Sequence, residues 1–371
     1  MIPPPRPIEA NDYPALARFC ASFPGEKREE SYWLARFHFW WEENPAFSTD
    51  FPRGGVLEKE GQLGGMFALI PSRVQFNGQS RVAANMSCWR VLPHFRGRSL
   101  ALFLMLLEQA KNHPVFNTTP TPEVETILHR VPFLPFAQGI QTESVWISRP
   151  RESGWWEGVK RICQISWNWS PRPASRPLPL AVVQTLAQQN RQMTRLRHAM
   201  AQAGTLAVCA AIGPAFDRLW QRTGHHQALT NLRTGPALEW YLNANPNPGR
   251  PLLLTHEKNG ELRAFGLFAR RPSPHWPDRE HLYALDVWAE PSWEEHLLPL
   301  LGFALQHARE ADIPVLRIPH YHPELTRLCA GIGLTRPLPK PLTCYYLPPA
   351  GESPPDPATM RPSRNMGDYG C

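Results

Sequence analysis

The sequence of 371 residues contains no uninterrupted apolar run of about 18 residues, the length that a membrane-spanning helix needs. Its first residues, MIPPPRPIEANDYP, also lack the apolar core of a signal peptide. We therefore expect a cytoplasmic protein without a transmembrane segment.

Cysteine is scarce and irregularly spaced. The seven cysteines are odd in number, and no two of them form a CxxC pair. This distribution indicates neither a disulfide framework nor a zinc site. We expect reduced thiols and no bound metal.

Long runs of like charge are absent as well. The formal net charge is +7, yet no five consecutive residues carry charge of the same sign. A dedicated nucleic-acid-binding arm is therefore disfavoured. The positive excess favours anionic partners, and a phosphate-bearing cofactor would use that charge locally.

Proline, by contrast, is abundant and unevenly placed. The 42 prolines crowd into the first residues, into residues 150–179 and into the segment after residue 347. Such segments are typical of linkers and loose ends. The prolines predict an N-terminal domain at residues 1–149, followed by a Trp- and Pro-rich connector with a helix at residues 150–205. A C-terminal domain is predicted at residues 206–348 and a disordered tail at residues 349–371.

Two distant parts of the chain resemble each other. FHFWWEENP (residues 37–45) and LEWYLNANP (residues 238–246) are aromatic helical runs that end in Asn-Pro. Each is followed by patterns typical of two strands joined by a Gly-containing turn, then strand, loop, helix and strand. A Pro-Glu pair then opens a short helix, at Pro122 and at Pro323. The proline that ends the aromatic run precedes this second proline by 77 residues in both copies (122 − 45 and 323 − 246), which indicates a tandem repeat.

Basic residues stand between a predicted strand and a predicted helix in WRVLPHFRGRSLALF (residues 89–103). The first backbone N–H groups of a helix have no partner within the helix, and the helix dipole adds positive character there. Arg96 and Arg98 add full charges to the same turn. The segment therefore predicts an anion site, with phosphate as the natural ligand.

Small residues accompany this turn. Gly97 would let a ligand approach the backbone closely, and Ser99 and Ala101 are too small to block it. The neighbouring Leu100 and Leu102 are expected to face inward. An ordinary solvated basic turn is the alternative interpretation of the same residues.

The pattern Arg96-x-x-Ser99-x-Ala101 resembles the pyrophosphate loop of the GNAT superfamily of acyl-CoA-dependent N-acyltransferases, Arg/Gln-x-x-Gly-x-Gly/Ala, with serine at the first glycine. Residues 114–133 resemble the family's next segment, with Pro132-Phe133 in place of Gly-Phe. The resemblance implies the fold class α/β (α+β), with two GNAT-like domains, each a mixed, mainly antiparallel sheet flanked by helices.

The second copy departs from this pattern. It carries Glu294 and Glu295 where the first copy carries Arg96 and Arg98. Carboxylates at a helix start repel a pyrophosphate. We therefore expect the second copy to be degenerate and not to bind CoA.

The resemblance also implies a reaction, in which an acceptor amine attacks the thioester of acetyl-CoA or another acyl-CoA. Backbone N–H groups of the strand before the turn would stabilise the thioester oxygen. The end of the next strand, at Asn117, is a candidate to contact the cofactor or the acceptor. The predicted cofactor-binding residues are Arg90, Val91, Leu92, Arg96, Gly97, Arg98, Ser99, Leu100, Ala101 and Asn117.

The reaction also needs a base that deprotonates the amine and an acid that protonates the leaving thiolate, and no motif in the sequence identifies them. The family often has a tyrosine near the short helix after the second core strand, and residues 122–133 contain none. Glu43, His129 and Cys88 are the catalytic candidates. Each has a plainer interpretation: a solvated helix end for Glu43, a surface histidine for His129 and a small buried thiol for Cys88.

The predicted function is acyl transfer to a primary amine of a small molecule, with an amino sugar as one candidate. Two alternatives remain open: an aminoacyl-tRNA-dependent transferase of tandem GNAT-like fold, and a non-catalytic acyl-CoA-binding protein. The connector, with Trp155, Trp156, Trp167 and Trp169, is expected to clamp the domains rather than to bind a ligand. The sequence does not indicate an oligomeric state.

Overall fold

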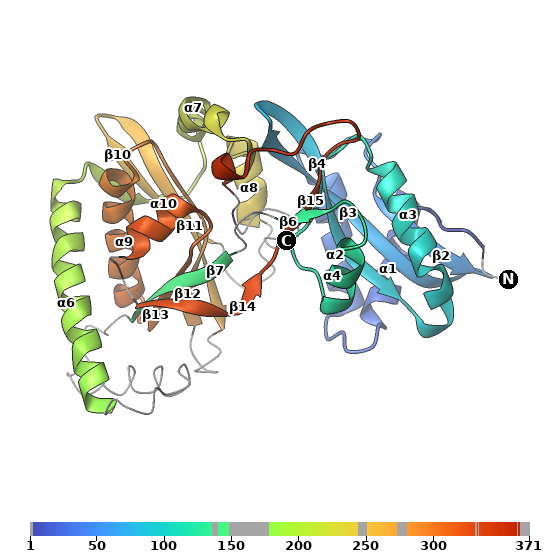
Figure 1. Cartoon of the computed structure of the whole chain (residues 1–371), viewed down its shortest axis with the longest axis horizontal. Coiled ribbons are helices and arrows are strands. Elements are labelled where there is room, and N and C mark those ends of the chain that lie inside the picture. The colour runs from blue at the N-terminus through green and yellow to red at the C-terminus, as the bar shows by residue number, and fades with distance from the viewer. Residues whose placement is uncertain are drawn as a thin grey trace. The chain divides into compact units, whose positions relative to one another are not determined.

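The computed structural model describes residues 3–135, 140–147, 178–243, 251–272, 280–330, 332, 334–361 and 363. The Trp-rich part of the connector lies outside the described residues. The chain forms two compact units (Figure 1). Unit 1 comprises Met1–Gly139, Gly224–Ala244 and Leu342–Cys371, and unit 2 comprises Ile140–Thr223 and Asn245–Pro341.

Unit 1 is built on an eight-stranded sheet in the order β1-β2-β3-β4-β5-β15-β6, with β9 also paired to β3. Neighbouring strands of this sheet pair antiparallel, except β4 and β5, which pair parallel. The strands are β1 (Arg6–Pro7), β2 (Gly54–Lys59), β3 (Gln62–Phe76), β4 (Gln79–Val91), β5 (Val115–Asn117), β6 (Leu134–Pro135), β9 (Leu229–Asn231) and β15 (Tyr345–Leu347).

Helices cover the sheet of unit 1. Short turns of helix are η1 (Ala10–Asp12), the π-helical η2 (His38–Glu42), η3 (Pro93–Arg98), η4 (Gly224–His226) and η5 (Pro357–Thr359). The longer helices are α1 (Tyr13–Ala21), α2 (Glu30–Phe37), α3 (Ser99–Gln109), α4 (Pro122–Leu128) and α8 (Gly235–Asn243).

Unit 2 has a seven-stranded sheet in the order β14-β7-β13-β12-β11-β10-β8. The strands are β7 (Ile140–Ile147), β8 (Thr205–Val208), β10 (Leu252–Lys258), β11 (Glu261–Pro272), β12 (Glu280–Ala289), β13 (Val315–Pro319) and β14 (Leu334–Leu342). Its helices are α6 (Leu178–Gln202), α7 (Pro214–Thr223), α9 (Trp293–Glu310) and α10 (Pro323–Ala330).

The two sheets have the same strand order because each copy gives its last strand to the other unit. β7 follows β6 in the chain but pairs with β13 in unit 2, and β15 follows β14 but pairs with β5 in unit 1. The run β2-β3-β4-α3-β5-α4 then matches β10-β11-β12-α9-β13-α10. The predicted fold class is confirmed, and the linear boundaries predicted at 149/150 and 205/206 do not follow the units.

The residues after 348 are also part of unit 1. The Arg361 amide donates to the Leu229 carbonyl at 2.8 Å, and the Asn77 amide side chain donates to the Ser353 carbonyl at 2.9 Å. Met360 is 6% exposed and packs with Phe76. The predicted disorder is therefore wrong for residues 349–361, because this segment buries apolar surface and pairs its backbone.

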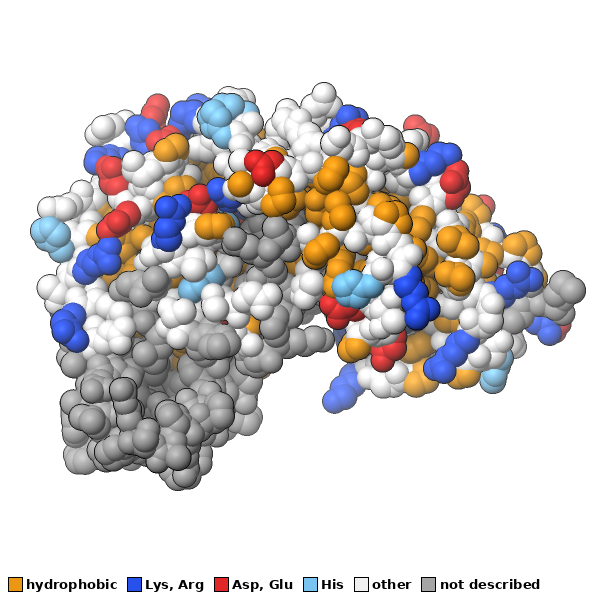
Figure 2. All heavy atoms as spheres, in the orientation of Figure 1, with side chains coloured by type: hydrophobic (Ala, Val, Ile, Leu, Met, Phe, Trp, Pro, Cys, Tyr) orange, Lys and Arg blue, Asp and Glu red, His pale blue; other side chains and the backbone are white. Residues whose placement is uncertain are grey.

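Helix α3 shows why the sequence builds this core. Leu102, Phe103 and Leu106 are spaced to share one helix face, and all three are buried in the cluster that also contains Phe67. Leu100 and Leu104, four residues apart, lie on another face and are 59% and 54% exposed. The expectation that Leu100 faces inward is therefore wrong. Figure 2 shows hydrophobic side chains at the surface of unit 1 in the region of α3.

The exchanged strand β7 is held in unit 2 by buried polar groups. Glu143 accepts two hydrogen bonds of 3.0 Å from Arg317 of β13, and the Glu143 side chain is fully buried. His320, which follows β13, contacts the Thr142 hydroxyl at 2.8 Å through Nδ1 and the Ser144 hydroxyl at 2.9 Å through Nε2. Ser144 also donates to the Cys329 carbonyl, so its hydroxyl accepts from the neutral imidazole.

Acid is expected to weaken this attachment. Burial lowers the pKa of His320 from 6.5 to about 4 because the charged imidazolium is poorly solvated there. The stabilisation from neutral His320 is thus complete above pH 6.5 and is lost as the pH falls towards 4. Urea unfolding at pH 7 and pH 5 should show a loss of about 1–2 kcal/mol that the His320→Gln variant lacks. An equal loss in that variant would contradict the assignment.

Among the described residues, no helix combines the length and apolar character needed to cross a membrane.

Candidate functional site

An opening in the sheet of unit 1 defines the candidate site. β4 and β5 pair in parallel only at Ala84 with Val115 and Asn85 with Phe116. β4 continues to Val91, whereas β5 ends at Asn117. From Met86 onward, the edge of β4 that faces β5 therefore has no strand partner among the described residues, and a ligand can reach its backbone.

A β-bulge lies on β4 at this opening. Met66 of β3 pairs with Arg90 and Ala68 pairs with Ser87, so Cys88 and Trp89 together stand opposite Phe67. Cys88 has φ of 51°, in the left-handed region. The extra residue turns the Arg90 side chain towards α1 and α2, where it bonds the Cys20 carbonyl and lies 4.7 Å from the Trp33 ring centre. Trp89 points to the opposite face, where its ring stacks on Phe67 at 4.9 Å.

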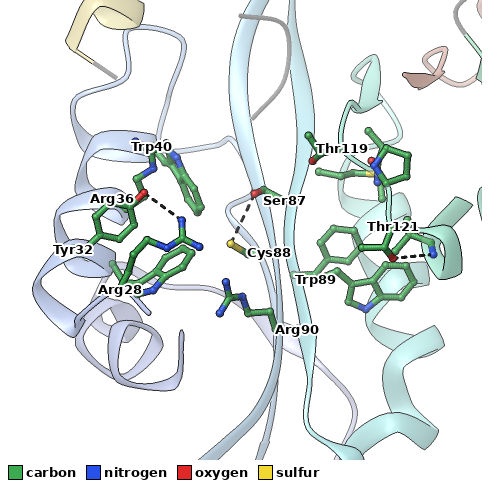
Figure 3. A pocket seen from close by; sticks show the side chains of 16 residues that line it. Arg28, Tyr32, Arg36, Trp40, Ser87, Cys88, Trp89, Arg90, Thr119 and Thr121 are labelled. Atoms are coloured by element: carbon green, nitrogen blue, oxygen red, sulfur yellow. Dashed lines mark hydrogen bonds between the residues drawn. The ribbon is translucent and has the colours of Figure 1, made fainter. Parts of the chain in front are cut away.

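The bulge lines a pocket of about 310 Å³. One wall comes from the α2–η2 segment and the other from β4 and the chain after β5. Figure 3 shows Arg28, Tyr32, Arg36 and Trp40 on the side of α2, facing Ser87, Cys88 and Arg90. The lining residues are Arg28, Tyr32, Trp33, Arg36, Trp40, Phe67, Met86, Ser87, Cys88, Trp89, Arg90, Asn117, Thr119, Pro120, Thr121 and Val124.

Glu26 fixes two arginines at the pocket. Arg28 bonds Glu26 through Nε at 2.7 Å and Nη2 at 2.9 Å, and Arg90 bonds it through Nη2 at 2.7 Å. Hydrogen bonds from Arg28 first, and then from Arg90, hold the pKa of the Glu26 carboxyl far below its ordinary value. Glu26 therefore stays ionised and orients both guanidinium groups.

Aromatic rings surround the third arginine. Arg36 is 6% exposed, and its guanidinium carbon lies 5.7 Å from the Trp40 ring centre, 5.8 Å from Phe39 and 5.9 Å from Tyr32. The Arg28 guanidinium lies 4.6 Å from the Trp33 ring centre. Ring faces stabilise a buried cation without neutralising it.

The predicted anion site lies at the end of the same strand. β4 leads through Leu92 into η3 and then into α3, and Arg96 and Arg98 belong to η3. Among the described residues, neither arginine pairs with a carboxylate. A Cβ added at Gly97 would meet nothing within 4 Å, so the space beside this backbone is open. Ser99 and Ala101 are half-buried in the first turn of α3.

The backbone N–H groups of Arg90, Val91 and Leu92, which were predicted to contact the thioester, do not all point in the same direction. The Leu92 amide donates to the Gly64 carbonyl at 2.8 Å, which contradicts its predicted role towards a thioester. Paired residues of an antiparallel ladder alternate between bonded and non-bonded pairs. The Arg90 amide therefore also faces β3, whereas the Val91 amide faces the opening. Of the three, Val91 is placed to donate to a ligand.

The structure does not bring the three predicted catalytic residues together. Cys88 lines the pocket, 3.8 Å from the Ser87 hydroxyl. Glu43 is exposed at the end of η2, and His129 is exposed at the end of α4, and neither lines the pocket. Asn117, predicted as a contact residue, does line it.

A tyrosine beside α4 was missed because it comes from the other end of the chain. The Tyr345 hydroxyl, on β15, donates to Glu125 at 2.6 Å and lies 3.2 Å from His129 Nε2. Burial, with help from the Glu125 hydrogen bond, raises its pKa to about 12. Tyr345 pairs in β15 with Asn117 of β5. No local pattern near residue 345 signals this placement, since it follows from the strand exchange.

The corresponding turn of unit 2 is different. Three residues (290–292) join β12 to α9, whereas seven residues (92–98) join β4 to α3. Glu294 pairs with Arg195 of α6, and Glu295 bonds Lys258 at 2.7 Å. The start of α9 thus carries paired carboxylates instead of open cationic groups.

Comparison with known proteins gives fold relatives only. No family model matches the chain, and no curated protein sequence matches it. A GCN5-related N-acetyltransferase from Anabaena variabilis is 12% identical with a TM-score of 0.54, over 92% of this chain and 71% of that one. A conserved protein of unknown function from Enterococcus faecalis, described as a probable N-acyltransferase, is 11% identical with a TM-score of 0.56 over the same shares.

Saccharomyces cerevisiae N-myristoyltransferase with bound myristoyl-CoA is 13% identical with a TM-score of 0.52, over 98% of this chain and 84% of that one. This match spans both units. The chain has a tandem GNAT fold. The resemblance inferred from the basic turn is confirmed at the level of the fold. Unit 1 contains the opening between β4 and β5, the bulge on β4 and the basic turn before α3.

Proposed function

We propose that the chain is an acyl-CoA-dependent N-acyltransferase and that unit 1 binds the CoA thioester. The observation that carries the proposal is the placement of the pocket and the basic turn on one strand. From Arg90 to Pro93 the chain advances by about 10 Å at the rise of an extended strand. A ligand that contacts both must be elongated and anionic at the end that meets Arg96 and Arg98, as an acyl-CoA is.

The chemistry needs little from side chains. The amine nitrogen attacks the thioester carbonyl carbon, the carbon–sulfur bond breaks, and the proton released by the amine balances the proton gained by the CoA thiolate. The Val91 amide supports the developing negative charge on the carbonyl oxygen. Tyr345 is neutral at physiological pH, and we assign it as the candidate donor to the thiolate from the β5 side.

Thiol release is the direct test. The full chain is incubated with acetyl-CoA and with D-glucosamine, D-glucosamine 6-phosphate, L-phenylalanine or 2-phenylethylamine, and free CoA thiol is measured. Release that depends on one of these amines is the expected result. Acetyl-CoA binding without release from any amine would favour an acyl-CoA sensor, and salt-dependent retention of aminoacyl-tRNA would favour the tRNA-dependent alternative.

A further inference from the structure

In the proposed function, the acceptor amine meets the thioester end of the acyl-CoA at the pocket beside α2. This pocket has an unusual charge for a site that receives an amine. Arg28, Arg36 and Arg90 line it, and none of the lining residues that the structure describes is acidic. Glu26, which contacts Arg28 and Arg90, offsets one of the charges of these two arginines. Arg28 and Arg90 together keep a charge of about +1 at neutral pH, and this charge repels a protonated amine that carries no anionic group.

Two of these arginines keep hydrogen-bond donors for a ligand. A guanidinium has five N–H groups. Arg28 uses three, two towards Glu26 and one towards the Tyr32 hydroxyl at 3.4 Å. Arg90 uses two, towards Glu26 and the Cys20 carbonyl. In Figure 3 both guanidinium groups extend into the space between α2 and β4.

Indole donors add to this set. Trp33 and Trp40 are each 3% exposed, and their Nε1 groups have no hydrogen-bond partner among the residues that the structure describes. A buried donor without a partner destabilises the protein unless a ligand or water accepts from it. The walls of the pocket therefore carry guanidinium groups and unpartnered indole N–H groups, and both call for oxygen acceptors.

We propose that the acceptor is a small primary amine that also carries an anionic group, a carboxylate or a phosphate, and that this group binds Arg28 and Arg90 beside the indole N–H groups. This inference rests on the proposed function. Ligand pockets span roughly 300–1,000 Å³, so a pocket of about 310 Å³ fits a single small molecule such as an amino acid or an amino sugar phosphate.

Matched pairs of amines test the proposal. Binding to the full chain in the presence of CoA is measured by calorimetry for L-phenylalanine against 2-phenylethylamine, and for D-glucosamine 6-phosphate against D-glucosamine. In at least one pair, we expect the amine that carries the anionic group to bind tenfold or more tightly than its partner without that group. The pair that shows selectivity distinguishes a carboxylate from a phosphate. Selectivity in neither pair, including absence of binding in both, would overturn the proposal.

Variants locate the effect. Arg28→Gln, whose side chain is 48% exposed, should lower the preference for the anionic member at least fivefold. Arg18→Gln on α1, with a side chain 62% exposed, is the matched control and should leave the preference unchanged. Equal loss in both variants would show that net charge, rather than the pocket, causes the selectivity.

Failure of this inference and failure of the proposed function give different results. Selective binding of an anionic amine without thiol release would retain the inference and contradict the proposed function. Thiol release at equal rates from both members of each pair would retain the proposed function and overturn the inference.

Discussion

Replacing Arg96 and Arg98 together with alanine is expected to weaken acetyl-CoA binding by about a hundredfold, because two charge-assisted contacts to phosphate would be lost. Each such contact contributes about 1.5–3 kcal/mol when shielded, and we take the lower end because Arg96 is exposed and Arg98 half-buried. Isothermal titration of the full chain with acetyl-CoA measures the change.

The matched control for this double variant is Arg18→Ala with Arg309→Ala, which removes the same charge from α1 and α9. It should bind acetyl-CoA as the unmodified chain does. If affinity is unchanged in the Arg96 and Arg98 variant, the basic turn does not hold the diphosphate, and the alternative of an ordinary solvated turn is correct. Weakening in both double variants would instead indicate a long-range effect of net charge.

Removing the Glu143 carboxylate is expected to destabilise unit 2 by about 3–5 kcal/mol, because Glu143→Ala leaves the Arg317 charge without its partner. The Glu143 side chain is fully buried and that of Arg317 is 15% exposed. Arg317 also lies over the Tyr283 ring, at 5.3 Å from its centre, and so has little room to turn towards water. Urea unfolding of the variant measures the loss.

An exposed ion pair in the same unit provides the comparison. Glu295 and Lys258 are joined at 2.7 Å, with side chains 52% and 42% exposed. Glu295→Ala should cost about 1 kcal/mol or less, since solvent screens such pairs. Similar losses in the Glu143 and Glu295 variants would mean that the Glu143–Arg317 pair does not anchor the exchanged strand β7.

Local features of unit 1 could be predicted from the sequence because they depend on neighbouring residues. The strand, basic turn and helix at residues 89–103 follow from alternation, then Pro93, then apolar residues at helical spacing. The short helices that start at Pro122 and Pro323 follow from proline at a helix start. These signals were sufficient to indicate the repeat and the fold.

The pocket was only partly predicted. Cys88, Arg90 and Asn117 were identified because they lie on the strands next to the basic turn. Arg28 and Arg36 were not, because an arginine just before or within an amphipathic helix looks like a solvated residue until the opposite wall of the pocket is known. The direction of Arg90 depends on the bulge at Cys88, which the sequence pattern does not show.

The sequence by itself determined the repeated order of elements, the contrast between Arg96 and Arg98 in one copy and Glu294 and Glu295 in the other, and the GNAT fold. Only the tertiary structure decided which strand completes which sheet, and hence that Tyr345 lies beside α4 and Glu143 beside Arg317. Helix and turn preferences act over a few residues, so they can be predicted from the local sequence. Strand exchange depends on pairing between segments about 200 residues apart. The strand of its own copy and the strand of the other copy offer a sheet the same backbone groups, so the local sequence does not decide between them.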